Sequence, residues 1–151
     1  MASPFPFVAD AILTAADLNS IGTSTAWTPS FSYGVTIGDG TVTGTYLQVN
    51  DLIVAEAKFV FGSTSAVSTF VRAALPVQGV DAFEIATGTR GLSQDTSTGE
   101  TFPLMGRAYD PAAVYLYAID AGGTYAVGSS SQPFTWVTGD VLQWTSVYMA
   151  A

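Results

Sequence analysis

The part of the chain that follows Ala26 has a two-residue period, in which apolar and polar side chains alternate until Gly, Pro, Asn or Asp interrupts the run. Side chains of a β-strand point alternately to the two faces of a sheet, so this period indicates strands rather than helices. The runs Thr41–Val49 and Leu52–Phe61 are separated by Asn50 and Asp51 alone. Two strand-like runs joined by such a short turn predict a β-hairpin.

The second run of this hairpin has one apolar and one polar face. Its apolar face carries Ile53, Ala55, Ala57, Phe59 and Phe61. Glu56 and Lys58 fall on the opposite face, which we expect to be solvated.

Further runs of the same kind occupy most of the remaining chain: Ala66–Leu75, Ala82–Thr89, Phe102–Ala108, Ala112–Asp120, Thr124–Val127, Phe134–Val137 and Asp140–Met149. Many short strands at even spacing are typical of an all-β sandwich or barrel, and we expect an antiparallel, jelly-roll-like sandwich. Gly91–Thr101 is the longest segment without a strand pattern. Loops of that length are usually functional or mobile, so this loop is our first candidate for ligand binding.

The first residues of the chain follow a different pattern. Met1–Phe7 is rich in Pro and Phe and is expected to be extended. Thr14–Ile21 predicts a short helix, capped by Thr14 with Asp17 three residues later and stopped by Gly22. We therefore divide the chain into an N-terminal segment, residues 1–25, and a β-sandwich domain, residues 26–151.

The N-terminal segment is more apolar than a free terminus requires. Its large apolar side chains are Phe5, Phe7, Ile12, Leu13, Leu18 and Ile21. Burying one such side chain is worth about 1.5–3 kcal/mol, so a few of them can hold a protein on a larger assembly. We predict that they dock the chain. The alternative is that they pack against their own domain or a sister chain.

Charge and composition exclude several classes of function. The 151 residues contain neither His nor Cys, which excludes a Ser–His–Asp or Cys–His nucleophile and any metal site built on these ligands. Only four residues are Lys or Arg against twelve acidic ones, a net charge of −8, so binding to nucleic acid or anionic lipid is not expected. We see neither the basic, apolar start of a signal peptide nor the ~20 apolar residues of a membrane span.

The low charge content also bears on assembly. Charged residues make up 11% of the chain, which is less than half the share of about 25% in an average globular protein. In Ala112–Asp120, Tyr115 and Tyr117 alternate with Val114 and Leu116, so both faces of that strand are apolar. A strand that is apolar on both faces is normally covered on both faces. We therefore expect a homo-oligomer.

Carboxylates are the plentiful titratable groups, so a glycosidase-like acid pair and a Ca²⁺ site are the chemistries to weigh. The candidate pairs Asp81/Glu84, Asp95/Glu100 and Asp110/Asp120 all lie in or beside predicted turns, where Asp caps local backbone groups. We accordingly predict no catalytic residue, no metal and no cofactor. Candidate ligand residues lie in or directly before the long loop, or are tryptophans near prolines: Arg90, Asp95, Glu100, Trp27 and Trp136.

Three stretches of the sequence resemble small virion proteins of tailed bacteriophages. The first, Phe7–Ile21, is similar to the opening segment of many tail-fibre and minor tail proteins. The second, Gly38–Tyr46 continuing through Phe59–Val67, resembles the first hairpins of a recurrent β-domain, and the third, Gln132–Leu142 with Tyr148, resembles its closing strands. The resemblance implies a virion component, a homotrimer docked on other virion proteins, that acts as a non-enzymatic adhesin for a host-surface glycan. The absence of a shaft leaves capsid decoration or a head fibre as an alternative. A free oligomeric lectin is a further alternative.

Overall fold

The computed structural model describes residues 22–81, 85, 88–119, 125–127 and 130–151. The predicted helix and docking residues of the N-terminal segment lie outside this part of the chain. The described strands are β1 (Thr25–Trp27), β2 (Phe31–Thr36), β3 (Thr41–Val49), β4 (Leu52–Val60), β5 (Ala66–Ala74), β6 (Thr89–Gln94), β7 (Thr101–Asp110), β8 (Ala113–Ile119), β9 (Tyr125–Val127) and β10 (Val141–Met149). Every pairing between them is antiparallel. The predicted all-β, antiparallel class is therefore confirmed.

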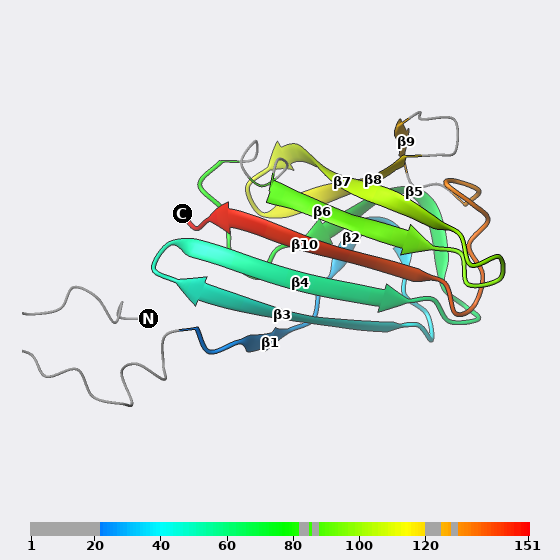
Figure 1. Ribbon diagram of the computed structural model, residues 1–151, viewed down its shortest axis with the longest axis horizontal. Coiled ribbons are helices and arrows are strands. Elements are labelled where there is room, and N and C mark those ends of the chain that lie inside the picture. The colour runs from blue at the N-terminus through cyan, green and yellow to red at the C-terminus, as the bar shows by residue number, and fades with distance from the viewer. Residues whose placement is uncertain (1–21, 82–84, 86–87, 120–124, 128–129) are drawn as a thin grey trace, which may run out of the picture.

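The strands form one sheet in the order β1-β3-β4-β10-β6-β7-β8-β5-β2, and β9 pairs with β8. This sheet curls into an open half-barrel, so its two halves face each other as the layers of a sandwich do (Figure 1). Phe31 of β2 joins the layers, because its ring centroid lies 5.5 Å from that of Phe59 on β4 and 6.1 Å from that of Trp144 on β10.

In the β3–β4 hairpin, β3 has the predicted bounds and β4 ends at Val60, one residue before the predicted end. Asn50 occupies the turn with a positive φ. Asparagine tolerates this conformation better than most residues do. Along β4, Ile53 and Phe59 are buried while Glu56 and Lys58 are exposed, so both predicted faces are confirmed. Because of this alternation, the apolar face of β4 lies in the core, between the two halves of the curled sheet.

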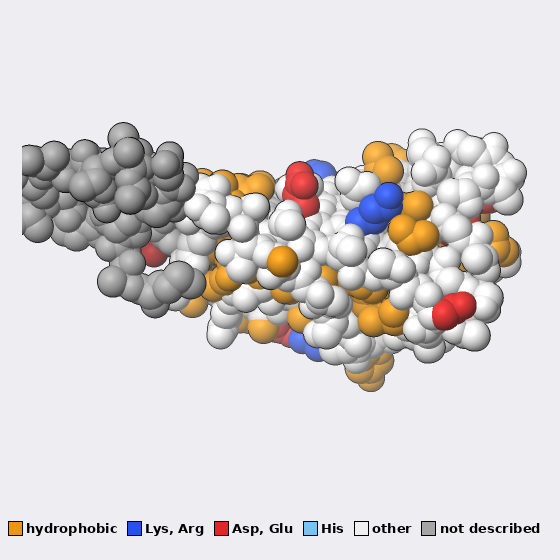
Figure 2. All heavy atoms as spheres, turned by 90° about the horizontal axis from the view of Figure 1, so that it is seen from below, with side chains coloured by type: hydrophobic (Ala, Val, Ile, Leu, Met, Phe, Trp, Pro, Cys, Tyr) orange, Lys and Arg blue, Asp and Glu red, His pale blue; other side chains and the backbone are white. Residues whose placement is uncertain are grey.

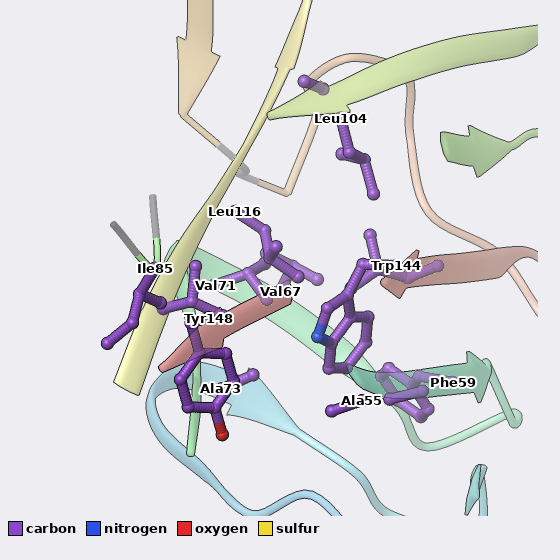
Figure 3. Close-up of a cluster of buried hydrophobic side chains, with 14 of the residues drawn as sticks. Ala55, Phe59, Val67, Val71, Ala73, Ile85, Leu104, Leu116, Trp144 and Tyr148 are labelled. Carbon is purple, nitrogen blue, oxygen red and sulfur yellow. The ribbon is translucent and has the colours of Figure 1, made fainter. Parts of the chain in front are cut away.

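The core is centred on β10, which lies between β4 and β6. Its inward residues Leu142, Trp144 and Tyr148 are almost fully buried, and Figure 3 shows the last two between side chains of both layers. The Tyr148 hydroxyl donates to the carbonyl oxygen of Val77 at 2.7 Å, and burial raises the pKa of this phenol to about 12. The strand that closes the sequence therefore contributes the largest buried side chains.

Three expectations about local structure are wrong. The predicted strand Ala82–Thr89 is not one, because Ile85 and Gly88 are helical and the strand β6 begins only at Thr89. The predicted strand Phe134–Val137 is irregular chain whose aromatic rings pack on the core. The predicted loop Gly91–Thr101 is shorter than expected, because its first residues up to Gln94 belong to β6.

The domain has two distinct ends. Gly22, the turn at Asn50 and Asp51, and Ala151 lie at one end, where Ala150 donates its N–H to the carbonyl oxygen of Asp51 (Figure 1). The segments 37–40, 61–65, 95–100 and 130–140 lie at the opposite end, which we call the loop end. The chain therefore enters the described fold at the end remote from these loops.

Candidate functional site

At the loop end, two turns are tied together by Asp39. Its carboxylate accepts hydrogen bonds from the Thr64 backbone N–H at 2.8 Å, the Thr64 hydroxyl at 2.8 Å and the Ser63 hydroxyl at 2.7 Å. These bonds, the Thr64 N–H above all, hold the pKa of Asp39 well below its usual range, because they favour the charged form. The carboxylate therefore stays ionised at neutral pH and connects the β2–β3 turn to the β4–β5 turn.

The loop between β6 and β7 is also held by carboxylates. Asp95 accepts hydrogen bonds from the Ser97 hydroxyl at 2.6 Å and the Ser97 N–H at 2.8 Å, and these lower its pKa. The fully buried Asp140 accepts from the Thr96 N–H at 3.0 Å and the Val137 N–H at 2.6 Å. The loop is thus fixed both to itself and to the segment before β10.

A series of contacting aromatic rings, which we call the aromatic column, packs beneath the turns of the loop end, on the core side. Phe61 lies on Phe59 with a centroid distance of 4.3 Å, and Trp136 stacks on Phe61 at 4.5 Å with an interplanar angle of 15°. Phe134 contacts Trp136 at 4.5 Å and Phe102 at 5.5 Å. Trp136 is therefore largely a packing residue, since Phe61 covers one face of its indole.

The predicted ligand residues do not form one site. Asp95 and Glu100 lie together at the loop end, where the Asp95 N–H donates to the carbonyl oxygen of Glu100 at 3.0 Å. Trp136 lies at the same end. Trp27 lies on the edge strand β1, and Arg90 lies at the opposite end of β6. Of the five, Glu100 and Arg90 have exposed side chains, while Asp95 is buried.

The structure brings Arg90 close to a set of residues that the sequence did not single out. Arg72, Tyr115 and Arg107 form one row across β5, β8 and β7. The Arg72 guanidinium lies 5.8 Å from the Tyr115 ring centroid and forms an ion pair with Asp110. In the neighbouring row Arg90 lies opposite Met105, which lies opposite Tyr117.

Arg107 links the two rows. Its guanidinium lies 5.5 Å from the Tyr117 ring centroid and donates to the Tyr117 hydroxyl at 3.0 Å. We call these residues the arginine–tyrosine surface: Arg72, Arg90, Arg107, Tyr115 and Tyr117. Arg90 and Arg107 are exposed, whereas Tyr117 is buried. It holds three of the four basic residues of an acidic chain, so it is the part of the described surface best suited to an anionic group. Alternation in the sequence does place both tyrosines on one face, but the strand order that adds the arginines is non-local.

Two carboxylates of the predicted acid pairs bind neighbouring groups of the protein. Asp95 caps its own loop, and Asp110 accepts from the Ala112 N–H at 2.7 Å besides pairing with Arg72. Glu84 and Asp120 lie outside the described residues. Within the described chain there is no cluster of three or more metal-ligating side chains.

A shallow hollow of about 180 Å³ lies on the outer face between β3, β4 and β10. Its lining includes Glu56, Lys58, Thr43 and Gln143. Such a small open hollow, with one carboxylate and one ammonium group, is suited to ordered water or a single polar group rather than to an enclosed substrate.

The surface is otherwise poor in charge. Figure 2 shows one face of the molecule, on which charged side chains are few and lie scattered among apolar and uncoloured atoms. Within the described chain, we find no helix with the length and hydropathy that crossing a bilayer requires. Neither protein-family models, nor curated proteins, nor solved structures give a match to this chain.

Proposed function

We propose that this chain is a virion structural protein of a tailed bacteriophage, a non-enzymatic adhesin domain of the minor-tail or tail-fibre type. The observation that carries the proposal is the polarity of the fold. Gly22 lies at one end of the sheet and the hydrogen-bonded loops lie at the other. A domain attached through the residues before Gly22 presents its loops away from the attachment point. The resemblance of Phe7–Ile21 to phage tail proteins supports the same orientation.

The rigidity of the loop end supports a role in recognition. Asp39, Asp95 and Asp140 fix its turns by hydrogen bonds before any ligand is present. Binding to preformed loops avoids most of the entropy that flexible loops lose on association. Arg90 and Arg107 offer a second exposed surface, toward the ends of β6 and β7 that lie away from these loops, and the Arg107 guanidinium lies beside a tyrosine ring. Tyr117 is itself buried, so the exposed guanidinium groups are what suits the carboxylates of an acidic glycan of a host surface.

We further propose that the working unit is a homotrimer. Among the described residues, Tyr33 and Val80 are each 64% exposed, and Leu92 and Val137 are each 45% exposed. Apolar side chains with so few charges around them favour burial against other copies. Light scattering at micromolar concentration should give three times the chain mass of 15.7 kDa. A mass equal to that of one chain would contradict the trimer.

Location in the particle is tested by counting copies. Quantified against the major capsid protein, a tail adhesin should be present in only a few copies per virion. A copy number that follows the capsid lattice would instead establish head decoration. If purified particles lack the protein, both virion assignments fail.

Adhesin activity is tested with the isolated protein. It should slow phage adsorption to host cells by competing for the receptor. The double variant Arg90→Ala/Arg107→Ala should compete at least about tenfold less well, a loss of about 1.4 kcal/mol. Lys58→Ala, which removes the basic residue outside the arginine–tyrosine surface, serves as the matched control and should compete like the wild type. Binding to a glycan array by a protein that is absent from particles would establish the free lectin.

A further inference from the structure

The outer face of β3, β4 and β10 carries a contiguous apolar patch at the end where the described chain begins. In the sheet register Val54 lies opposite both Leu47 and Val147, and Leu52 lies opposite both Val49 and Met149. Leu52, Val147 and Met149 are 40%, 40% and 38% exposed. We call this set the terminal patch: Leu47, Val49, Leu52, Val54, Val147 and Met149.

The terminal patch is sharply bounded. The next row along the strands is polar and consists of Thr45, Glu56 and Thr145. On the other side lies the exposed turn at Asn50 and Asp51. Polar rows thus separate this patch from the valines Val60 and Val141 at the far end of the same face. An apolar patch bounded in this way is the usual arrangement where another element covers a surface.

Gly22, the first residue that the structure describes, lies beside this patch. A Cβ atom built on Gly22 would lie 3.6 Å and 4.0 Å from the two δ carbons of Leu47, so the chain arrives directly beside the patch. Gly22 has a φ of +85°. This is the left-handed region that the residue after a helix commonly adopts. The conformation agrees with the stop signal that the sequence places at Gly22.

The segment before Gly22 matches the patch in size and chemistry. A helix over Thr14–Ile21 would be about 12 Å long at about 1.5 Å per residue. Three adjacent strands span about 10 Å between the axes of the outer two. Leu18 and Ile21 are three residues apart, or about 4.5 Å along a helix axis, close to the strand spacing of about 4.8 Å.

We propose that the helix Thr14–Ile21 lies across the terminal patch of its own chain, with Ile21 against β3 and Leu18 against β4. Its own chain is favoured over a sister chain because the tether at Gly22 keeps the helix at a local concentration in the millimolar range. The position of the helix does not depend on the proposed function, but the following consequence rests on it. A seated helix fixes the direction in which Phe5 and Phe7 leave the domain toward a virion partner.

Disulfide trapping tests the arrangement, since the chain has no cysteine of its own. The full-length variant Leu18→Cys/Leu52→Cys, mildly oxidised at low protein concentration, should form an intramolecular disulfide. The control Leu18→Cys/Lys58→Cys places the second thiol on the same outer face of β4, six residues or about 20 Å farther along the strand. We expect at least about tenfold less intramolecular disulfide in the control.

Other outcomes overturn the proposal. Equal yields in both variants would mean that the helix has no fixed seat. Disulfide-linked dimers in the first variant would mean that a sister chain covers the patch.

A second measurement does not depend on disulfide geometry. Deletion of residues 1–21 should expose the terminal patch and increase the binding of a hydrophobic fluorescent dye, and Leu18→Asp should do the same. Thr25→Asp, on the exposed edge strand, should leave dye binding unchanged. Unchanged dye binding after the deletion would contradict the proposal. All of these experiments use isolated protein, so a failure here is distinct from an absence of the protein from virions.

Discussion

The buried carboxylate of Asp140 binds Thr96 twice, through the backbone N–H at 3.0 Å and through the hydroxyl at 3.1 Å, although 44 residues separate the two in the sequence. The same carboxylate accepts from the Val137 N–H. One side chain thus fastens the β6–β7 loop to the start of β10. The rigidity of the loop end depends on it.

Asp140→Ala should lower the free energy of unfolding by about 2–4 kcal/mol, because it leaves buried N–H groups without acceptors. Urea titration measures the loss, and hydrogen exchange should show faster exchange at Thr96 and Val137. Glu100, at an exposed position of the same loop, provides the control. Glu100→Ala should change the free energy of unfolding by about 0.5 kcal/mol or less. Equal effects of the two substitutions would contradict the assigned role.

Substitutions of Gly91 and Gly99 compare the cost of steric crowding with the cost of backbone strain. A Cβ on Gly91 would lie 2.1 Å from the carbonyl oxygen of Gln143, whereas a Cβ on Gly99, whose φ is +78°, would contact nothing within 4 Å. Gly99→Ala should therefore cost about 1–2 kcal/mol from conformation alone. Gly91→Ala should cost about 3 kcal/mol or more, because two paired strands must move apart. Thermal melting of both variants measures the difference, and a smaller loss for Gly91→Ala would refute this account.

Asp39 predicts a dependence of stability on pH. Its pKa is lowered in the folded protein. Its contribution is therefore complete above the ordinary aspartate pKa of about 3.9 and is lost as the pH falls through the folded pKa. Asp39→Asn should lie closer in stability to the wild type at acid pH than at pH 7. Asp51→Asn, in the exposed β3–β4 turn, is the comparison. Parallel pH profiles for wild type and Asp39→Asn would contradict the prediction.

The ion pair between Arg72 and Asp110 should be modest in energy. Both side chains are partly exposed, so solvent weakens their attraction. A double-mutant cycle with Arg72→Met and Asp110→Asn should give a coupling of about 0.5–1 kcal/mol, and salt at about 1 M should reduce it. A coupling near zero would mean that the contact with Tyr115, rather than the charge of Asp110, holds Arg72.

The sequence predicted the elements whose pattern is local. The β3–β4 hairpin depends on alternation within β4 and on a turn that Asn50 tolerates, and both are readable from neighbouring residues. β6 was missed because its inward positions carry Thr89, Gly91 and Ser93 rather than apolar side chains. The buried Thr89 hydroxyl is hydrogen-bonded to the Ser146 hydroxyl, with 2.8 Å between the two oxygen atoms, and Ser146 lies 57 residues away in the sequence. No apolar alternation can reveal such a strand.

The segment Phe134–Val137 is wrongly predicted as a strand, because its residue types are typical of strands although its backbone is irregular. Phe134 and Trp136 have the composition of a strand, but their rings are used to extend the aromatic column from Phe61. The candidate surfaces also divide into one that local sequence predicts and one that depends on distant strand pairing. Asp95 and Glu100 were found because they flank one loop, whereas the arginine–tyrosine surface depends on the pairing of β8 with β5 and β7.

The central position of β10 has a consequence for synthesis in the cell. The last strand along the chain pairs with both β4 and β6, so the two halves of the sheet cannot join until residue 149 has left the ribosome. About 100 residues separate the end of β3 at Val49 from the end of β10 at Met149. At about 5–20 residues per second, the apolar faces of the earlier strands therefore remain uncovered for roughly five to twenty seconds. Ribosome-bound chains that stop short of Val141 should therefore be chaperone substrates and protease-sensitive, and resistance should appear in one step when Trp144 and Tyr148 enter the core.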